Sequence, residues 1–175
     1  MMYYTPPALR MLKDLGIPLS SVIGRNLQEF DEAKALELAE VDANSRQHLL
    51  VPLAALAWRQ LKASAGKQDV NIYIVSAFRT VERQAAIIKK KLASGLSIEE
   101  ILTVSAPPFF SEHHTGCAVD IGTSGSAVLE REFENSLAYE WLTENARSFG
   151  FHMSYPIDNA AGYAYEPWHW RFKAD

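Results

Sequence analysis

The pattern of apolar and polar positions divides the chain into helices and short strands. Residues 29–40 have helical spacing with an acidic face. A longer helix is expected from Ser45 to about Ala65, because its apolar side chains recur every three or four positions. The β-branched and aromatic run at 71–75 predicts a buried strand.

Downstream of this strand the same patterns alternate without a regular βαβ order. The expected elements are a helix at 80–94, a short helix opened by a capping box at 97–100, a strand at 116–121, a helix at 136–149 and strands at 151–155 and 167–172. Helices and short strands mixed in this way predict an α+β fold. A single domain is expected over residues 1–175.

Composition narrows the class of protein. The chain has 175 residues, of which 48% are hydrophobic and 22% charged, and this is typical of a globular domain that can bury a real core. The formal net charge of -4 argues against a nucleic-acid partner. No apolar run approaches the roughly 18 residues of a membrane span. The N-terminus has no basic region followed by a long apolar one, so we expect a cytoplasmic protein, or a periplasmic one if a leader was removed.

Two short segments carry the candidate chemistry, SEHHTGCAVD at 111–120 and EPWHW at 166–170. Together they supply two histidines, an aspartate and a glutamate. A mononuclear zinc hydrolase needs such a set, with three ligands, an open position for water and a carboxylate that moves the proton of that water. The candidate ligands are His113, Asp120 and His169, with Glu166 as the base. Spacing alone is weak support, since a histidine and an aspartate within ten residues often occur by chance.

The single cysteine lies inside the first segment and could be mistaken for a ligand. It cannot form an intramolecular disulfide. In a strand at 116–121, Cys117 and Asp120 point to opposite faces, so Cys117 is expected to be a buried structural thiol. His48 and His152 are expected to be ordinary packing or surface histidines.

Three motifs in order resemble those of the VanY-type D-alanyl-D-alanine carboxypeptidases, which are zinc peptidases acting on peptidoglycan peptides. They are Ser76-Ala-Phe-Arg79-x-x-x-x-Gln84, Ser111-x-His113-x-x-Gly116-x-Ala118-x-Asp120 and Glu166-Pro-Trp-His169. The resemblance implies the small α+β fold shared with the hedgehog signalling domain, with a central antiparallel sheet. It also implies a catalytic core at 70–173, with residues 1–44 as an N-terminal extension packed on it.

The resemblance carries roles onto the matching positions. It implies one Zn²⁺ per chain on His113, Asp120 and His169, with Glu166 as the catalytic base. Further residues are implied to contact the substrate, and these are Ser76, Gln84, Ser111, Tyr155 and Trp168. For Tyr155 and Trp168, core packing is an equally good explanation.

Two assignments stay open at this point. By composition alone either His113 or His114 could bind zinc, and the motif frame favours His113, which leaves His114 a supporting role. Arg79 would either stabilise the oxyanion or bind the C-terminal carboxylate of the substrate through its bidentate fork.

Three functions are compatible with these motifs. The first is a zinc carboxypeptidase that releases C-terminal D-Ala from peptidoglycan stem peptides or muropeptides. Within it, L,D-cleavage of tetrapeptides is slightly favoured over D,D-cleavage of pentapeptides, because a cytoplasmic enzyme would meet recycled tetrapeptides. The second is a stem-peptide endopeptidase, and the third is a zinc-stabilised binding module without turnover.

Overall fold

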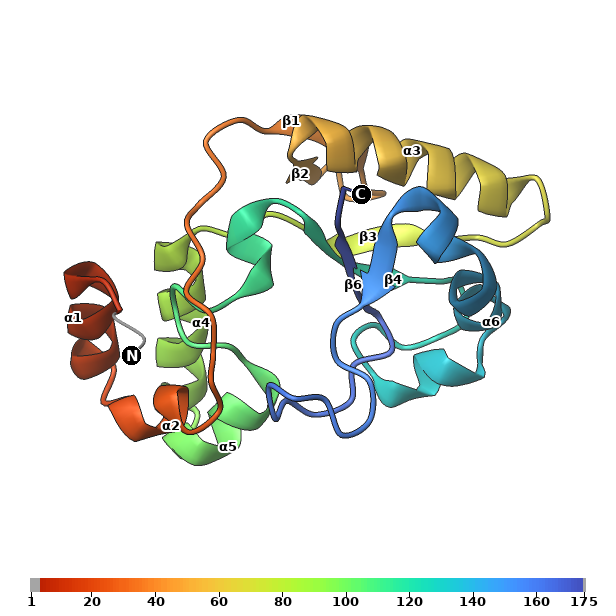
Figure 1. The fold of residues 1–175 in the computed structure, drawn as a ribbon. Helices are drawn as coiled ribbons and strands as arrows, with labels where there is room; N and C mark the ends of the chain where they lie inside the picture. Colours follow the sequence, from red (N-terminus) through yellow and green to blue (C-terminus); the bar gives the residue numbers. More distant parts are fainter. Residues whose placement is uncertain (1–3, 175) are drawn as a thin grey trace.

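The computed structural model describes residues 4–174, so residues 1–3 and 175 of the expected domain lie outside the described range. The strands form an antiparallel four-stranded sheet in the order β3-β4-β6-β5 and a two-stranded sheet of β1 and β2. Their bounds are β1 (Glu37–Val41), β2 (Gln47–Leu50), β3 (Tyr73–Ser76), β4 (Ala118–Gly122), β5 (Phe151–Met153) and β6 (His169–Phe172). The expected α+β class with a central antiparallel sheet is confirmed (Figure 1).

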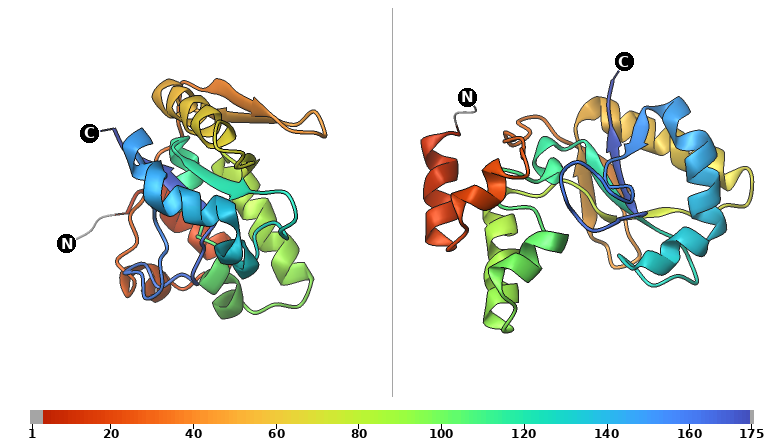
Figure 2. Two further views of the ribbon diagram at one scale, coloured as in Figure 1. Left: turned by 90° about the vertical axis from the view of Figure 1, so that its right-hand side faces the viewer. Right: turned by 60° about the horizontal axis from the view of Figure 1, so that its bottom comes forward.

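The helices gather in two groups. Figure 1 shows α3 and α6 near the sheet, whereas α1, α2, α4 and α5 lie together at the other end of the molecule, and Figure 2 shows the same separation from two other sides. The α-helices are α1 (Pro6–Asp14), α2 (Leu19–Ile23), α3 (Pro52–Gly66), α4 (Val81–Ala93), α5 (Ile98–Val104) and α6 (Leu137–Asn145). Short 3-10 helices are η1 (Glu112–Thr115), η2 (Arg131–Asn135) and η3 (Ala146–Phe149).

Each group of helices has its own apolar cluster. Trp58 of α3, Ile74 of β3 and Trp170 of β6 belong to the cluster that surrounds the sheet. Leu12 of α1 and Ile88 of α4 belong to the second cluster, between the helices at the other end. Burial of these side chains is the main favourable term that holds the two groups in place. None of the helices within 4–174 has the length and apolar character needed to cross a bilayer.

The helix expected at 29–40 is wrong. This stretch ends in β1, which pairs with β2 in an antiparallel ladder. The strand lets the carboxylate of Glu40 reach inward, where it accepts hydrogen bonds from Trp58 Nε1 at 2.9 Å and from the Ile74 amide at 3.3 Å. These contacts come from distant parts of the chain, and tertiary contacts of this kind override a local helical pattern.

The helix expected from Ser45 begins too early. Residues 47–50 form β2, and α3 begins at Pro52, with Val51 in an extended conformation at ψ 152°. Proline fits the first turn of a helix and disfavours a helical conformation in the residue before it. Pro52 therefore sets the boundary, and the apolar stripe that precedes it belongs to a strand.

The other expected elements are confirmed with shifted ends. Thr80 caps α4, and both hydrogen bonds of the capping box between Ser97 and Glu100 are present at α5. The helix expected at 136–149 divides into α6 and η3. The closing strand begins only at His169, and helices α1 and α2 had not been expected.

Candidate active site

Strand pairing places the three motifs side by side. β4 is the central partner, with Asp120 opposite Ser76 of β3 on one edge and opposite His169 of β6 on the other. One residue from each motif therefore lies in a single row across three strands. His113 precedes β4 in η1, and Gly116 joins the two in a left-handed conformation with φ 65°. A Cβ there would lie within 3.1 Å of three side chains, so glycine is required both for its backbone and for space.

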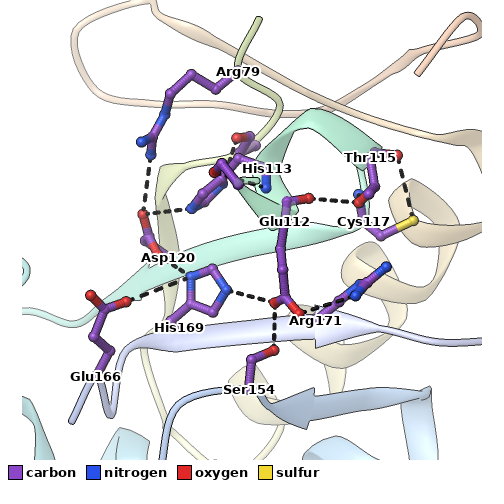
Figure 3. A network of polar contacts seen from close by, with 12 residues as sticks. Arg79, Glu112, His113, Thr115, Cys117, Asp120, Ser154, Glu166, His169 and Arg171 are labelled. Carbon is purple, nitrogen blue, oxygen red and sulfur yellow. Dashed lines mark hydrogen bonds and ion pairs between the residues drawn. The ribbon is translucent and has the colours of Figure 1, made fainter. Parts of the chain in front are cut away.

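Three buried side chains converge on one point. The ligand atoms of His113, Asp120 and His169 all lie within 4.8 Å of one another. Each carboxylate oxygen of Asp120 faces one ring, with 3.2 Å to His113 Nε2 and 2.9 Å to His169 Nδ1 (Figure 3). Two imidazole nitrogens and one carboxylate oxygen are the donor set of a catalytic zinc site with an open position, so the residues present fit zinc.

The outer nitrogen of each ring is already occupied. His113 Nδ1 donates to the carbonyl oxygen of Ala77 at 2.7 Å, which turns Nε2 toward the centre. His169 Nε2 contacts Oε2 of Glu112 at 3.0 Å, which turns Nδ1 toward the centre. Such outer partners fix the ring orientation and the tautomer of a ligating histidine.

The electrostatics of the centre suit a cation. Burial lowers the pKa of His113, so its ring stays neutral and keeps a lone pair available. Burial acts against the charged form of His169 too, but its hydrogen bonds to Asp120 and Glu112 outweigh it and raise the pKa of His169 to about 10. Although burial disfavours the Asp120 carboxylate, the two facing histidines hold its pKa well below the usual range. A carboxylate on each side of the His169 ring therefore favours positive charge there, carried either by a proton or by a bound cation.

Glu166 lies beside the cluster, with Oε2 at 4.0 Å from His169 Nδ1. A turn brings them together, because the His169 amide donates to the carbonyl oxygen of Glu166 at 3.1 Å. Burial raises the pKa of Glu166 to about 7, with the charge of Asp120 adding to the effect. A carboxyl group that titrates near neutral pH is suited to accept a proton and to give it back.

The polar residues of the upstream motif form a corner next to Asp120. The Arg79 guanidinium donates to Gln84 Oε1 at 2.7 Å and to Ser76 Oγ at 2.9 Å, and lies 3.8 Å from Asp120 Oδ2. Burial lowers the pKa of Arg79, while the charges of Asp120 and Glu166 act in the opposite direction. Ser111 is buried nearby, and its Oγ accepts from the His113 amide at 3.4 Å.

The two aromatic candidates lie at the same site. The Tyr155 ring stacks on that of His169, with 4.6 Å between centroids and 25° between planes. Trp168 is half-buried, packs against the sheet cluster and lines the cleft. Each side chain thus combines a packing role with a place at the site.

His114 cannot offer a free nitrogen to a metal. Its Nδ1 donates to the carbonyl oxygen of Arg79 at 2.6 Å, and its Nε2 accepts from the Phe109 amide at 3.2 Å. Cys117 precedes β4 and is half-buried rather than buried, so the expected burial of its thiol is wrong. Its Sγ contacts the carbonyl oxygen of Thr115 at 3.6 Å.

Sequence reasoning missed Glu112. Besides His169, its carboxylate binds Ser154 Oγ at 2.5 Å and the Arg171 guanidinium at 3.0 Å. Burial acts against its charge, yet the hydrogen bond to His169 and the other partners lower the pKa of Glu112 to about 2. The only signal in the sequence was an acidic residue next to a candidate ligand. The direction of the Glu112 side chain depends on how η1 packs against β6, which the sequence does not reveal.

A cleft of about 830 Å³ gives access to these groups. Its lining includes Gln84 and Lys91 of α4, Ser105 and the segment 163–166, together with Asp120 and His169 of the cluster. Its volume is in the range of pockets that hold small molecules and short peptide ends.

The fold and the site define a metallohydrolase-like centre, with a compact His-Asp-His cluster and a carboxyl group at neutral pKa beside it. The family model described as VanY, D-alanyl-D-alanine carboxypeptidase, matches residues 47–175. The chain therefore belongs to the VanY D-alanyl-D-alanine carboxypeptidase family.

Individual relatives agree with this assignment. The chain is 30% identical over 121 residues to a D-alanyl-D-alanine carboxypeptidase of Enterococcus faecium, and the match covers 67% of this chain and 35% of that protein. The chain spans less than half the length of the curated relatives it matches.

Solved structures share the fold. The LdcB LD-carboxypeptidase superimposes with a TM-score of 0.72 at 28% identity, covering 81% of this chain and 69% of that one. A mutant of the vancomycin-resistance D,D-pentapeptidase VanY in complex with Zn(II) superimposes with a TM-score of 0.61 at 30% identity, covering 83% and 80%. These similarities confirm the expected zinc-peptidase fold.

Proposed function

We propose that this protein is a zinc-dependent carboxypeptidase that releases the C-terminal D-Ala from peptidoglycan stem peptides. The observation that carries the proposal is the position of Glu166, half-buried, with Oε2 at 4.0 Å from Nδ1 of His169 in the cluster of His113, Asp120 and His169. A module that only bound zinc would have no use for a carboxyl group held beside the three ligands and not among them. The names of its relatives as carboxypeptidases support the same reaction.

The cluster would hold the metal through His113 Nε2, one oxygen of Asp120 and His169 Nδ1. Zinc supplies Lewis-acid polarisation of a carbonyl group and makes water acidic enough to react near neutral pH. Glu166 would take a proton from the attacking water on its carboxylate and deliver it to the leaving amine of D-Ala.

Arg79 would bind the C-terminal carboxylate of the substrate. Its guanidinium is held by Gln84 and Ser76 at the side of the cleft, so it presents a fixed donor geometry. Replacing Arg79 with Gln is expected to raise KM more than it lowers kcat. A loss mainly in kcat would assign Arg79 to the oxyanion instead.

For the bond that is cut, we propose L,D-cleavage of tetrapeptides. The LD-carboxypeptidase LdcB gives a TM-score of 0.72, but the L,D-carboxypeptidase DacB gives 0.59, below the 0.61 of the D,D-pentapeptidase, so similarity of fold does not choose between the two bonds and the assay decides. The test is to incubate the zinc-loaded protein with muramyl tetrapeptide and muramyl pentapeptide separately, with and without chelator, and to follow D-Ala release by mass spectrometry.

Each result of this assay has a definite meaning. Chelator-sensitive release from the tetrapeptide supports the proposal in full. Release from the pentapeptide only would make the protein a D,D-carboxypeptidase. Cleavage within the stem peptide, or no release by a zinc-loaded protein, would overturn the carboxypeptidase function in favour of an endopeptidase or a binding module.

A further inference from the structure

The N-terminal segment, defined here as residues 4–33, precedes the stretch that matches the family model, which begins at residue 47. It nevertheless contacts the segments that carry the site. After α2 it runs in an extended conformation past α4 (Figure 1), where the Phe30 amide donates to the carbonyl oxygen of Phe109 at 2.7 Å and the Ala33 amide to that of His114 at 2.8 Å. The N-terminal segment therefore lies directly against the motif at 111–120 and the chain that leads into it.

Arg25, just after α2, joins three separate parts of the chain. Its Nε donates to the carbonyl oxygen of Ala161 at 2.6 Å, and one terminal nitrogen donates to that of Leu102 at 2.8 Å. The guanidinium carbon lies 4.1 Å from the centre of the Tyr163 ring. Arg25 thus ties the N-terminal segment to the end of α5 and to the loop 156–165.

A stack of rings leads from Arg25 to the metal-binding cluster. Tyr163 contacts Tyr155 edge to face, with 4.8 Å between centroids, and Tyr155 stacks on His169 at 4.6 Å. The carbonyl oxygen of Tyr155 also accepts from the Glu166 amide at 3.0 Å. The loop 156–165 that Arg25 contacts is therefore flanked by Tyr155, which covers the His169 ring, and by Glu166, the proposed base.

A second set of contacts reaches the same ring from another side. The Arg171 guanidinium carbon lies 4.8 Å from the centre of the Phe30 ring. Arg171 donates to Glu112 at 3.0 Å, and Glu112 contacts His169 Nε2 at 3.0 Å (Figure 3). The face of His169 and its outer nitrogen are thus each connected to the N-terminal segment through two intermediate side chains.

We propose that the N-terminal segment is part of the active site, with Arg25 as a positioning residue that fixes the loop 156–165 and, through Tyr163 and Tyr155, the ring of His169. Outer contacts of this kind decide how precisely a ligand is held. An arginine is a costly choice for packing alone, because its second terminal nitrogen is buried without a partner among residues 4–174. What it adds over an apolar side chain is a rigid fork that binds two carbonyl groups in fixed directions.

The test compares zinc affinity in Arg25→Met, Arg25→Lys and a matched control, Arg59→Met. Arg59 also donates to a backbone carbonyl, that of Leu38 at 2.9 Å, but on the outer face of α3. Zinc affinity is measured by competition with a chromogenic chelator, and ligand geometry by the visible spectrum of the Co²⁺-loaded protein. The melting temperature of each metal-free variant shows whether stability has changed.

For Arg25→Met we expect zinc binding to weaken about 3- to 10-fold, at the lower end of effects seen for outer contacts, with a changed Co²⁺ spectrum. Arg25→Lys is expected to recover part of the affinity, and Arg59→Met to match the wild type. A lower melting temperature with wild-type zinc affinity and spectrum would overturn the proposal and leave Arg25 a stability role. If Arg25→Met does not fold, Arg25→Lys decides, since wild-type affinity and spectrum there would overturn the proposal as well.

This inference rests on the proposed function only for the role of His169 as a metal ligand. The two can fail separately, because zinc affinity and the Co²⁺ spectrum need no substrate. A wild-type protein that binds zinc but releases no D-Ala would contradict the function and still allow the Arg25 comparison. If the wild-type protein is an active carboxypeptidase and Arg25→Met leaves zinc affinity and the Co²⁺ spectrum unchanged, only the inference about Arg25 is contradicted.

Discussion

Two segments supply the candidate metal ligands, and they hold their histidines in different ways. In the segment 111–120, His113 Nδ1 donates to a main-chain carbonyl, that of Ala77 at 2.7 Å. In the segment 166–172, His169 is held by side chains, with Glu112 at its Nε2 and Tyr155 on its ring. A main-chain partner survives substitution of its residue, whereas a side-chain partner does not. The orientation of His169 should therefore be more sensitive than that of His113 to substitution of a single partner residue.

The largest effect is expected from Glu166, which lies next to His169 but is not one of the proposed ligands. Glu166→Gln removes the group that accepts and returns the proton, so kcat/KM should fall about 100- to 10,000-fold. Zinc content, measured by atomic emission, should stay at the wild-type level. Unchanged hydrolysis by this variant would show that another group moves the proton.

The pH dependence of the reaction should follow the same carboxyl group. The pKa of Glu166 is raised to about 7 in the metal-free protein, and a bound cation nearby lowers it. Glu166 must be unprotonated to act as a base, so kcat/KM should fall as pH decreases through a midpoint at or below this value. The measurement is a pH profile from 5 to 9, and activity that increases toward pH 5 would contradict the assignment.

Glu112 tests the contrast between the two histidines directly. Glu112→Ala removes the side-chain partner of His169, and zinc affinity should weaken about 10- to 100-fold. Glu112→Gln keeps an oxygen acceptor and should lose less. Ala77→Gly keeps the carbonyl that holds His113, and affinity within about twofold of the wild type is expected. Equal losses in the Glu112 and Ala77 variants, by chelator competition, would remove the contrast.

The smallest effect is expected from Cys117, the potential ligand that the structure turns away from the centre. It is half-buried, and its Sγ lies 3.6 Å from the carbonyl oxygen of Thr115. Cys117→Ala should leave zinc affinity unchanged and cost about 1 kcal/mol of unfolding free energy or less. A clear loss of bound zinc would place the thiol among the ligands.

The residues that the sequence could identify are those whose neighbours along the chain define them. His113 and Asp120 lie in one motif, and the order of apolar positions was enough to expect β4 and α4. The row formed by Ser76, Asp120 and His169 could not be deduced, because register between strands depends on contacts across the sheet. The motifs identified these residues as candidates, but only the pairing of β3, β4 and β6 shows that they lie side by side.

Two of the errors have the same origin. Residues 37–41 form β1 because Glu40 is held by Trp58 and Ile74, which local spacing does not reveal. Glu112 was missed because its direction is set by Ser154 and Arg171, over forty residues away. Contacts between distant segments decide both cases.

Helix α1 was missed for a local reason. Thr5 caps it and prolines occupy its first positions, so the Thr-Pro-Pro sequence is itself a signal for the start of a helix.

The proposed function depends most on which atoms bind the metal. The direct measurement is a crystal structure of the zinc-loaded protein with anomalous diffraction at the zinc edge. We expect one zinc ion per chain, at about 2.0–2.2 Å from His113 Nε2, one oxygen of Asp120 and His169 Nδ1, with Glu166 beside it and not bound. Zinc bound by His114 or Cys117, or no zinc at this cluster, would contradict the account.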